Sequence, residues 1–202
     1  MKKEILEIFK ENVDINRLMK DEQNINISYK DNSYFISYVE FLKYFKDLNK
    51  ITIHNMIIGI NFTHGWMPTI FDFRSNNFDE VVKILNNTKQ GIIPNIDQLE
   101  ILKKCFNNSL VGSSKILHFI NPDKFAIWDS RVFRYLTNKK YGIDNCKYYL
   151  DYLKFFEYIT NKPEYNKIHE SIINKVDYEM TKFRTLELIM YIKGKKNKLN
   201  KI

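Results

Sequence analysis

Hydrophobic and polar positions along most of the chain repeat with the period of an α-helix. The first segment places Ile5, Ile8, Phe9 and Val13 on one stripe of an otherwise charged sequence. Similar spacing predicts helices over 39–48, 52–60, 78–88, 96–106, 114–120, 130–137, 145–160, 164–178 and 181–193. The pattern therefore predicts a mostly α fold.

Residues 25–38 depart from the helical period. Ile25, Ile27 and Tyr29 alternate with polar residues, and the polar run 30–33 is typical of a turn. Residues 34–38 can then return as a second short strand. This alternation predicts a small β-hairpin near the N-terminus.

Local sequence signals mark where several of the predicted helices begin. Asn95 is followed three residues later by Gln98, a spacing typical of a capping box. Pro163 stands at the start of a helical segment, where its missing N–H costs least. Internal repeats and Pro- or Gly-rich linkers are absent from the sequence. We predict one helical domain over 1–193, followed by a basic disordered tail over 194–202.

Composition narrows the class of protein. The chain has 202 residues, of which 44% are hydrophobic, enough for a packed core. No run approaches the ~20 apolar residues of a membrane span, and charges interrupt the N-terminal segment, so neither a membrane span nor a secretory signal is expected. Two cysteines, Cys105 and Cys146, make neither a disulfide framework nor a metal-ligand cluster. These features favour a cytoplasmic protein.

The net charge of +8 has two interpretations. Only five of the 32 basic residues are arginine, and abundant lysine with Asn and Ile is typical of an AT-rich coding sequence, in which case the lysines are simply solvated. A basic protein also attracts polyanions, because neutralising phosphates releases counterions. The charge is compatible with a nucleic-acid partner.

The most distinctive stretch is 109–137, SLVGSSKILHFINPDKFAIWDSRVFRYLT. Residues 107–112 predict a turn that contains Gly112, and the next helix, capped by one of two serines, opens with Lys115. Pro122 ends that helix, because the residue before a proline is forced out of the α region. After an apolar connector, Asp129 or Ser130 caps a further helix.

This stretch resembles the helix-hairpin-helix superfamily of DNA glycosylases and abasic-site lyases. The segment LVGSSK is similar to the family's hairpin and its lysine, and FAIWDSRVFRYL is similar to its aspartate-bearing helix. The resemblance implies an orthogonal helical domain with a hairpin-like element over 96–120. It further implies that Lys115 attacks C1′ of a flipped nucleotide, while Asp129 stabilises the positive charge that develops on the sugar. The residues that would contact DNA are Gly112, Ser113, Ser114 and Arg131.

The chain departs from the family at identifiable points. Gly112 is the one glycine of the hairpin, where two are usual, and Asp129 follows Lys115 by only 14 residues. The four clustered cysteines of some members are missing, so no iron–sulfur cluster is expected. The four histidines are too scattered to suggest a metal site, and no other cofactor is expected.

Base flipping requires a pocket with stacking surfaces, and four side chains near unusual sequence are candidates for it: His118, Trp128, Trp66 and His64. Structural roles compete with this interpretation. Trp128 is also expected in the core, and His118 as a polar helix residue bonded to backbone. The segment 62–69, between two helical stretches, is either a packed corner or the rim of a ligand site.

Other residues have structural interpretations beside their functional ones. Lys115 fits a solvated side chain in a first helical turn, and Asp129 fits an ordinary N-cap. The aromatic segment 145–160 predicts a core helix. Arg184 and Glu187, three residues apart on a helix, predict a surface ion pair.

The sequence thus favours a DNA-binding protein of base-excision type, a glycosylase or abasic-site lyase that uses Lys115 and Asp129. The alternative is a non-catalytic nucleic-acid-binding or protein-interaction module that retains the fold. A hydrolase or nuclease using His118 or His64 is a distant third, because no acidic cluster for a metal is recognisable.

Overall fold

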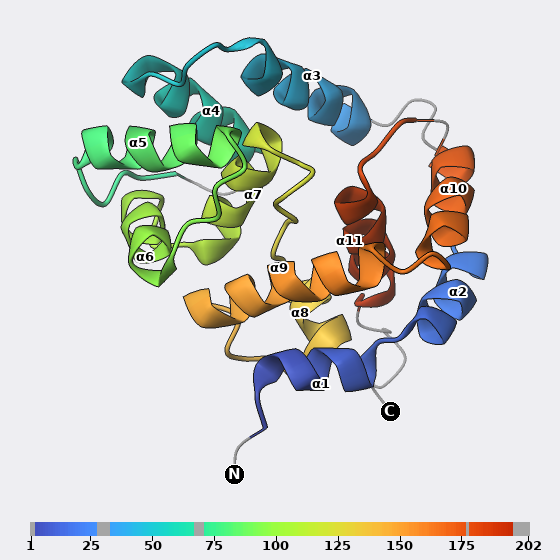
Figure 1. Ribbon diagram of the computed structural model, residues 1–202. Coiled ribbons are helices and arrows are strands. Elements are labelled where there is room, and N and C mark those ends of the chain that lie inside the picture. The colour runs from blue at the N-terminus through green and yellow to red at the C-terminus, as the bar shows by residue number, and fades with distance from the viewer. Residues whose placement is uncertain (1–2, 28–32, 67–70, 177, 196–202) are drawn as a thin grey trace, which may run out of the picture. The chain divides into compact units, whose positions relative to one another are not determined.

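The computed structural model of the chain describes residues 3–27, 33–66, 71–176 and 178–195. Within these ranges the chain forms eleven α-helices, and its only β-type pairing is an isolated bridge between Phe73 and Phe106 (Figure 1). The mostly α fold expected from the sequence is confirmed. None of the described helices is both long and apolar enough to cross a membrane.

Packing divides the chain into two compact units, which we describe separately. Unit 1 comprises residues 1–28, 128–143 and 148–202, and unit 2 comprises residues 29–127 and 144–147. The sequence predicted one domain over 1–193. The chain passes between the units at 127–128, inside an apolar run, so composition contains no linker signal there.

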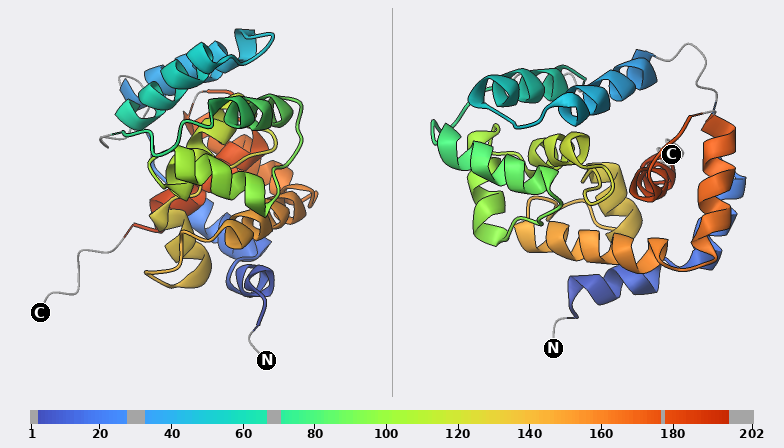
Figure 2. Two further views of the ribbon diagram at one scale, coloured as in Figure 1. Left: turned by 90° about the vertical axis from the view of Figure 1, so that its left-hand side faces the viewer. Right: turned by 45° about the horizontal axis from the view of Figure 1, so that its top comes forward.

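Unit 2 is built around one buried helix. Its helices are α3 (Ser33–Asp47), α4 (Ile53–Trp66), α5 (Phe78–Lys89), α6 (Ile96–Cys105) and α7 (Leu110–Ile120). Helix α7 packs against the other four, and α3 lies beside α4 (Figure 2). Every residue of α7 except Val111 is buried. A helix enclosed on all sides places even its polar side chains in the interior.

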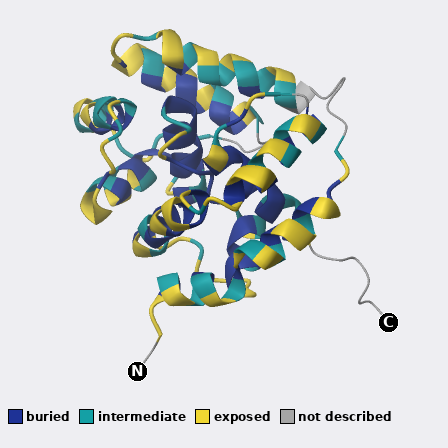
Figure 3. Cartoon of the chain, turned by 45° about the vertical axis from the view of Figure 1, so that its right-hand side comes forward, coloured by how far each residue is buried: buried dark blue, intermediate teal, exposed yellow. Residues whose placement is uncertain are grey.

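Unit 1 contains the helices from the two ends of the chain. They are α1 (Ile5–Asn12), α2 (Ile15–Gln23), α8 (Ser130–Thr137), α10 (Tyr165–Val176) and α11 (Lys182–Lys193), with α9 (Cys146–Thr160) from Tyr148 onward. Tyr149, Tyr152, Phe155 and Phe156 of α9 are fully buried, so the predicted core helix is confirmed. Figure 3 shows the usual amphipathic pattern, with many helices buried on one side and exposed on the other.

Most predicted helices agree with the structure, and the capping box is confirmed. The Asn95 side chain accepts from the Gln98 N–H, while the Gln98 side chain accepts from the Asn95 N–H. Helix α2 was not predicted. Its sequence INRLMKDEQ buries only Leu18 and Glu22, which leaves too few apolar positions to reveal a period.

The predicted β-hairpin is wrong where the structure describes it. Residues 34–38, expected as its second strand, belong to α3, and the expected turn over 30–33 lies outside the described residues except for Ser33. Tertiary packing overrides the local alternation, because α3 packs against α4 and α7. The segment 62–69 also differs from its prediction as a loop, since α4 continues to Trp66 and 67–70 lie outside the described residues.

Two further predictions are corrected near the C-terminus. Arg184 and Glu187, predicted on the surface, form an ion pair with exposures of only 1% and 2%. Gly194, assigned by the sequence to a disordered tail, is buried at the end of α11 and lies against the Arg131 carbonyl of α8. Helix α11 lies between α8, α2 and α10, so its polar positions also face other helices. Residues 196–202 lie outside the described residues.

Candidate functional site

The turn between α6 and α7 differs from the expected glycine hairpin. Asn107 and Asn108 adopt the left-handed conformation, with φ of 58° and 51°. Asparagine tolerates this region better than other residues with a side chain, so the turn needs no glycine. Ser109 is the N-cap, because its Oγ accepts from the Gly112 N–H at 3.0 Å. Helix α7 therefore begins at Leu110, before the predicted start, and Gly112 lies inside it.

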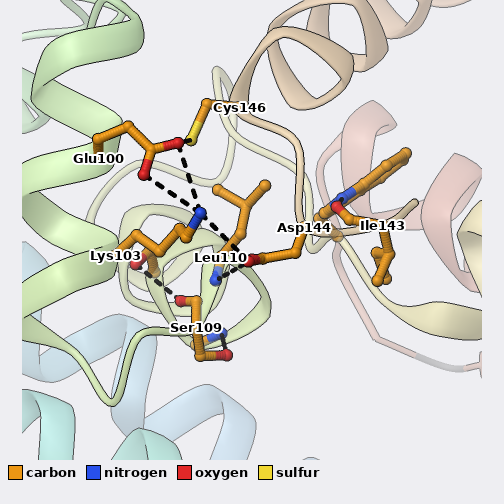
Figure 4. Close-up of polar contacts among 10 residues, drawn as sticks. Glu100, Lys103, Ser109, Leu110, Ile143, Asp144 and Cys146 are labelled. Atoms are coloured by element: carbon orange, nitrogen blue, oxygen red, sulfur yellow. Dashed lines mark hydrogen bonds and ion pairs between the residues drawn. The ribbon is translucent and has the colours of Figure 1, made fainter. Parts of the chain in front are cut away.

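Three backbone donors at the start of α7, those of Leu110, Gly112 and Ser113, have acceptors in the protein. Leu110 N–H donates to Oδ1 of Asp144 at 3.3 Å (Figure 4). Ser113 N–H donates to the Ser109 carbonyl at 3.0 Å. The Ser113 hydroxyl also donates to Ser109, and the Ser114 hydroxyl to the Val111 carbonyl. All three residues expected to bind a phosphate, Gly112, Ser113 and Ser114, are buried. The carboxylate of Asp144 takes the position at this helix start that an anion would favour.

Asp144 lies in the short segment 144–147 of unit 2 and belongs to a polar cluster with residues of α6 and α7. Lys103 Nζ lies 3.1 Å from both Oε2 of Glu100 and Oδ2 of Asp144. The Cys146 thiol donates to Oε1 of Glu100 at 3.1 Å (Figure 4). Burial, and then this hydrogen bond, raise the pKa of Cys146 to about 12. Cys146 thus stays a thiol at neutral pH and is not an activated nucleophile.

Replacing Asp144 by alanine is expected to lower the free energy of unfolding by about 1 kcal/mol, because α7 loses a carboxylate cap. The ion pair with Lys103 adds little, since the Asp144 side chain is 51% exposed. Urea unfolding followed by circular dichroism measures the change. Asp123→Ala, at an exposed turn residue, is the matched control and should change stability far less. Equal effects of the two substitutions would contradict the capping role.

Lys115 does not have the solvated position of an ordinary lysine. It lies in the second turn of α7 and is only 4% exposed. Burying an ammonium group is costly, and a buried lysine readily changes its protonation state. The position of α7 in the centre of unit 2 is the reason, because Lys115 lies on a helix that other helices surround.

His64 of α4 contacts the same helix. A Cβ built on Gly112 would lie 2.9 Å from Nε2 of His64, so the imidazole approaches α7 where glycine leaves room. The imidazole Nδ1 lies 3.0 Å from the Ile60 carbonyl, and its ring packs on Phe71 at 4.6 Å. Burial lowers the pKa of His64, the Ile60 carbonyl partly offsets this, and the charge of Lys115 lowers it further. His64 is therefore neutral at pH 7.

His118, three residues after Lys115, has both ring nitrogens in hydrogen bonds. Nδ1 lies 2.7 Å from the Phe125 carbonyl, and Nε2 lies 2.8 Å from the hydroxyl of Tyr38. Because a carbonyl only accepts, Nδ1 donates to Phe125, and Nε2 pairs with the Tyr38 hydroxyl. The backbone-bonded histidine predicted from the sequence is confirmed. Tyr38 also stacks on Trp66, which is half-buried at the end of α4.

The remaining predicted site residues belong to unit 1. Trp128 is fully buried and donates from Nε1 to the Ile143 carbonyl at 2.7 Å, so it is a core residue, as its structural interpretation predicted. Asp129 is the N-cap of α8, and its Oδ1 accepts from the Arg131 N–H at 2.7 Å. The Arg131 guanidinium lies over the Tyr191 ring, 4.4 Å from its centroid. The charge of Asp129 contributes to the raised pKa of Tyr191, which burial dominates.

Four of the site residues predicted from the sequence, Lys115, His64, His118 and Trp66, lie in unit 2. The sequence did not indicate Tyr38 or Asp144 as residues that contact α7. Tyr38 bonds a residue 80 positions away, and Asp144 bonds one 34 positions away, so no local pattern indicates either contact.

Among the described residues, one surface hollow lies outside this group of side chains. The hollow, of about 460 Å³, is lined by Arg74, Glu100, Lys104 and Asn108. Arg74 pairs with Asp72 at 2.9 Å and Glu100 with Lys103, so two of the hollow's three charged side chains already have partners in the protein. No group of three or more potential metal-ligating side chains is present among the described residues.

Comparison of the chain with protein-family models, with curated proteins and with solved structures finds no match.

Proposed function

We propose that this protein binds DNA and acts on a flipped nucleotide as a glycosylase or abasic-site lyase, with Lys115 as the amine nucleophile. The observation that supports the proposal is the burial of Lys115, 4% exposed on the central helix of unit 2. A lysine kept only for solubility gains from contact with water. A lysine that forms a Schiff base needs a site that favours its neutral amine, and burial has that effect.

Asp129 is proposed as the carboxylate that stabilises positive charge on the sugar. It is half-buried, and its role as N-cap of α8 holds the carboxylate in a defined position through the 2.7 Å bond to the Arg131 N–H. A positioned carboxylate stabilises an oxocarbenium-like transition state more than a mobile one, because no reorganisation is needed during the reaction. Capping and catalysis are therefore compatible in this residue.

DNA binding is proposed on the net charge of +8, which favours the phosphate backbone through counterion release. Of the four side chains predicted to line a base pocket, Trp66 fits a stacking role, because it is half-buried and stacks on Tyr38. Buried Trp128 and doubly bonded His118 fit structural roles instead.

One observation favours the alternative, a non-catalytic nucleic-acid-binding or protein-interaction module. At the start of α7 the N–H groups of Leu110 and Gly112 donate to Asp144 and Ser109, so these two donors are already used and are not offered to a phosphate. A protein that keeps the helices but not this grip fits a diverged module. The two proposals differ in whether Lys115 forms a covalent adduct.

Borohydride trapping tests the proposal. The protein is incubated with duplex oligonucleotides that carry an abasic site, 8-oxoguanine or uracil, and covalent adducts are counted on denaturing gels. The wild-type protein is expected to form an adduct with at least one duplex. Lys115→Met, which removes the amine but keeps an unbranched side chain in the buried position, is expected to form none. Lys83→Met is the matched control, because Lys83 is exposed on α5 of the same unit.

Asp129→Asn separates catalysis from capping in the same assay. Asparagine caps a helix as well as aspartate does, so the melting temperature should change little. Loss of the carboxylate is expected to slow adduct formation by about 100-fold. Salt-sensitive DNA binding without any adduct in the wild type would favour the binding module. Neither an adduct nor binding would reject both proposals.

A further inference from the structure

His64 presents a hydrogen-bond acceptor toward α7. Its Nδ1 lies 3.0 Å from the Ile60 carbonyl, which can only accept, so Nδ1 is the protonated nitrogen of the ring. Nε2 consequently has the lone pair. This atom faces Gly112, where a Cβ would lie at 2.9 Å, so the missing side chain lets the imidazole edge reach the helix.

Lys115 lies one helical turn beyond Gly112, so the two residues are neighbours on the surface of α7. His64 and Lys115 are buried to similar degrees, with exposures of 2% and 4%. The charge of Lys115 acts on His64 in the same direction as burial, because both lower the pKa of the imidazole. Ile60, Gly112 and Phe71, the other contacts described around the His64 ring, are uncharged.

Two positive charges on neighbouring elements in an interior of low dielectric repel each other. The pair therefore favours states in which Lys115 and His64 together hold a single added proton, on one group or the other. A neutral imidazole beside an ammonium is the arrangement from which a proton can be transferred.

We propose that His64 is the proton acceptor that converts the Lys115 ammonium to the reactive amine. The inference rests on the proposed function of Lys115 and adds the group that activates it. His64 acts through Lys115 and has no assigned contact with substrate. Gly112 is required for this contact between His64 and α7, because any larger residue would push the imidazole away from the helix.

In this reaction His64 accepts one proton from Lys115 and later returns it, and water is the only product that leaves. Nε2 of His64 takes one proton from the Lys115 ammonium, leaving an amine and an imidazolium. The amine nitrogen forms a bond to the aldehyde carbon of a ring-opened abasic site, and a proton moves from nitrogen to the carbonyl oxygen to give a neutral carbinolamine. The imidazolium then returns its proton to the hydroxyl group, the C–O bond breaks, and water leaves. The product is a protonated imine with His64 neutral again.

The test follows Lys115 in two assays on the full-length protein. The first measures the single-turnover rate of the borohydride-trapped adduct with an abasic duplex between pH 5.5 and 9. The second needs no DNA: the protein reacts with formaldehyde and cyanoborohydride, and methylation of Lys115 is measured by peptide mass spectrometry. The second assay reports on the same amine–carbonyl chemistry even if the DNA substrate is wrong.

His64→Ala is expected to slow Lys115 modification by about 100-fold at pH 7, the usual contribution of general acid–base catalysis. Added imidazole should restore much of the rate by entering the vacated space, a response that a purely structural role does not produce. The wild-type rate should fall as pH drops through the pKa of His64, and the variant should lack this dependence. His64→Gln is the second variant, because glutamine is closer in size to histidine and guards against impaired folding of the alanine variant. It should show the same loss of rate.

His54→Ala is the matched control, since His54 is an exposed histidine on the same helix and should react like wild type. Unchanged Lys115 rates in both His64 variants, or a loss that imidazole does not restore and that leaves the pH dependence intact, would overturn the inference. If DNA gives no adduct while formaldehyde labelling still depends on His64, the proposed function fails and the role of His64 stands.

Discussion

Glu187→Gln is expected to lower the free energy of unfolding by about 3 kcal/mol or more, because it removes the negative partner of a buried ion pair. Arg184 and Glu187 are 1% and 2% exposed on α11, and Nη1 of Arg184 donates to Oε2 of Glu187. When one member of such a pair is neutralised, the other charge remains in a medium that solvates it poorly. Urea unfolding followed by circular dichroism measures the change.

The double variant Arg184→Met/Glu187→Leu distinguishes a lost charge from lost packing. Removing both charges takes away the desolvation cost as well, so the double variant should be more stable than Glu187→Gln. Glu7→Gln is the matched control, since Glu7 pairs with Lys10 at the same spacing but on an exposed surface. It should change stability by less than about 0.5 kcal/mol. A double variant no more stable than the single one would contradict the interpretation.

Gly194→Ala is expected to lower the free energy of unfolding by about 3 kcal/mol, by overpacking the contact between α11 and α8. A Cβ at this position would lie 2.1 Å from the Arg131 carbonyl oxygen and 2.9 Å from that of Met190. Both are backbone atoms, so a rotamer change cannot relieve the overlap, and the helices must separate. The φ of −76° suits any residue, so the cost is steric.

Gly65→Ala is the corresponding control in unit 2. Gly65 lies in α4, and a Cβ there would meet nothing within 4 Å. Alanine should raise the free energy of unfolding by about 0.5–1 kcal/mol, because it favours the helix over glycine. Thermal and urea unfolding of both variants give the comparison. Equal stability of Gly194→Ala and wild type would show that the two helices have room to adjust.

The helices were the most predictable part of this protein, because their signals are local. The apolar stripe of α1 and the capping box at Asn95 both lie within one or two helical turns, and both agree with the structure. Prediction failed where local pattern and packing disagree. Residues 34–38 alternate like a strand but are helical in α3, which packs on α4 and α7. The start of α7 was misplaced because asparagines, and not Gly112, adopt the left-handed turn.

The candidate site was predictable in its residue types and not in its contacts. The unusual composition of 109–137 made Lys115 a candidate nucleophile, and the unusual composition of 62–69 made His64 a candidate for the pocket. Periodicity could not show that Lys115 is buried, because a lysine on an amphipathic helix is normally solvated. A core position was one of the two interpretations of Trp128, and its full burial agrees with that one.

The sequence by itself determined the mostly α class, most helix positions and a lysine-bearing segment of unusual composition, since each depends on neighbours along the chain. Only the tertiary structure decided that Lys115 and His64 are both buried, that Tyr38 bonds His118, that Asp144 accepts from the first N–H of α7, and that Arg184 and Glu187 are enclosed. The physical reason is common to all of them. Burial, electrostatic coupling and the protonation of a side chain depend on which helices surround it, and the local sequence does not contain that information.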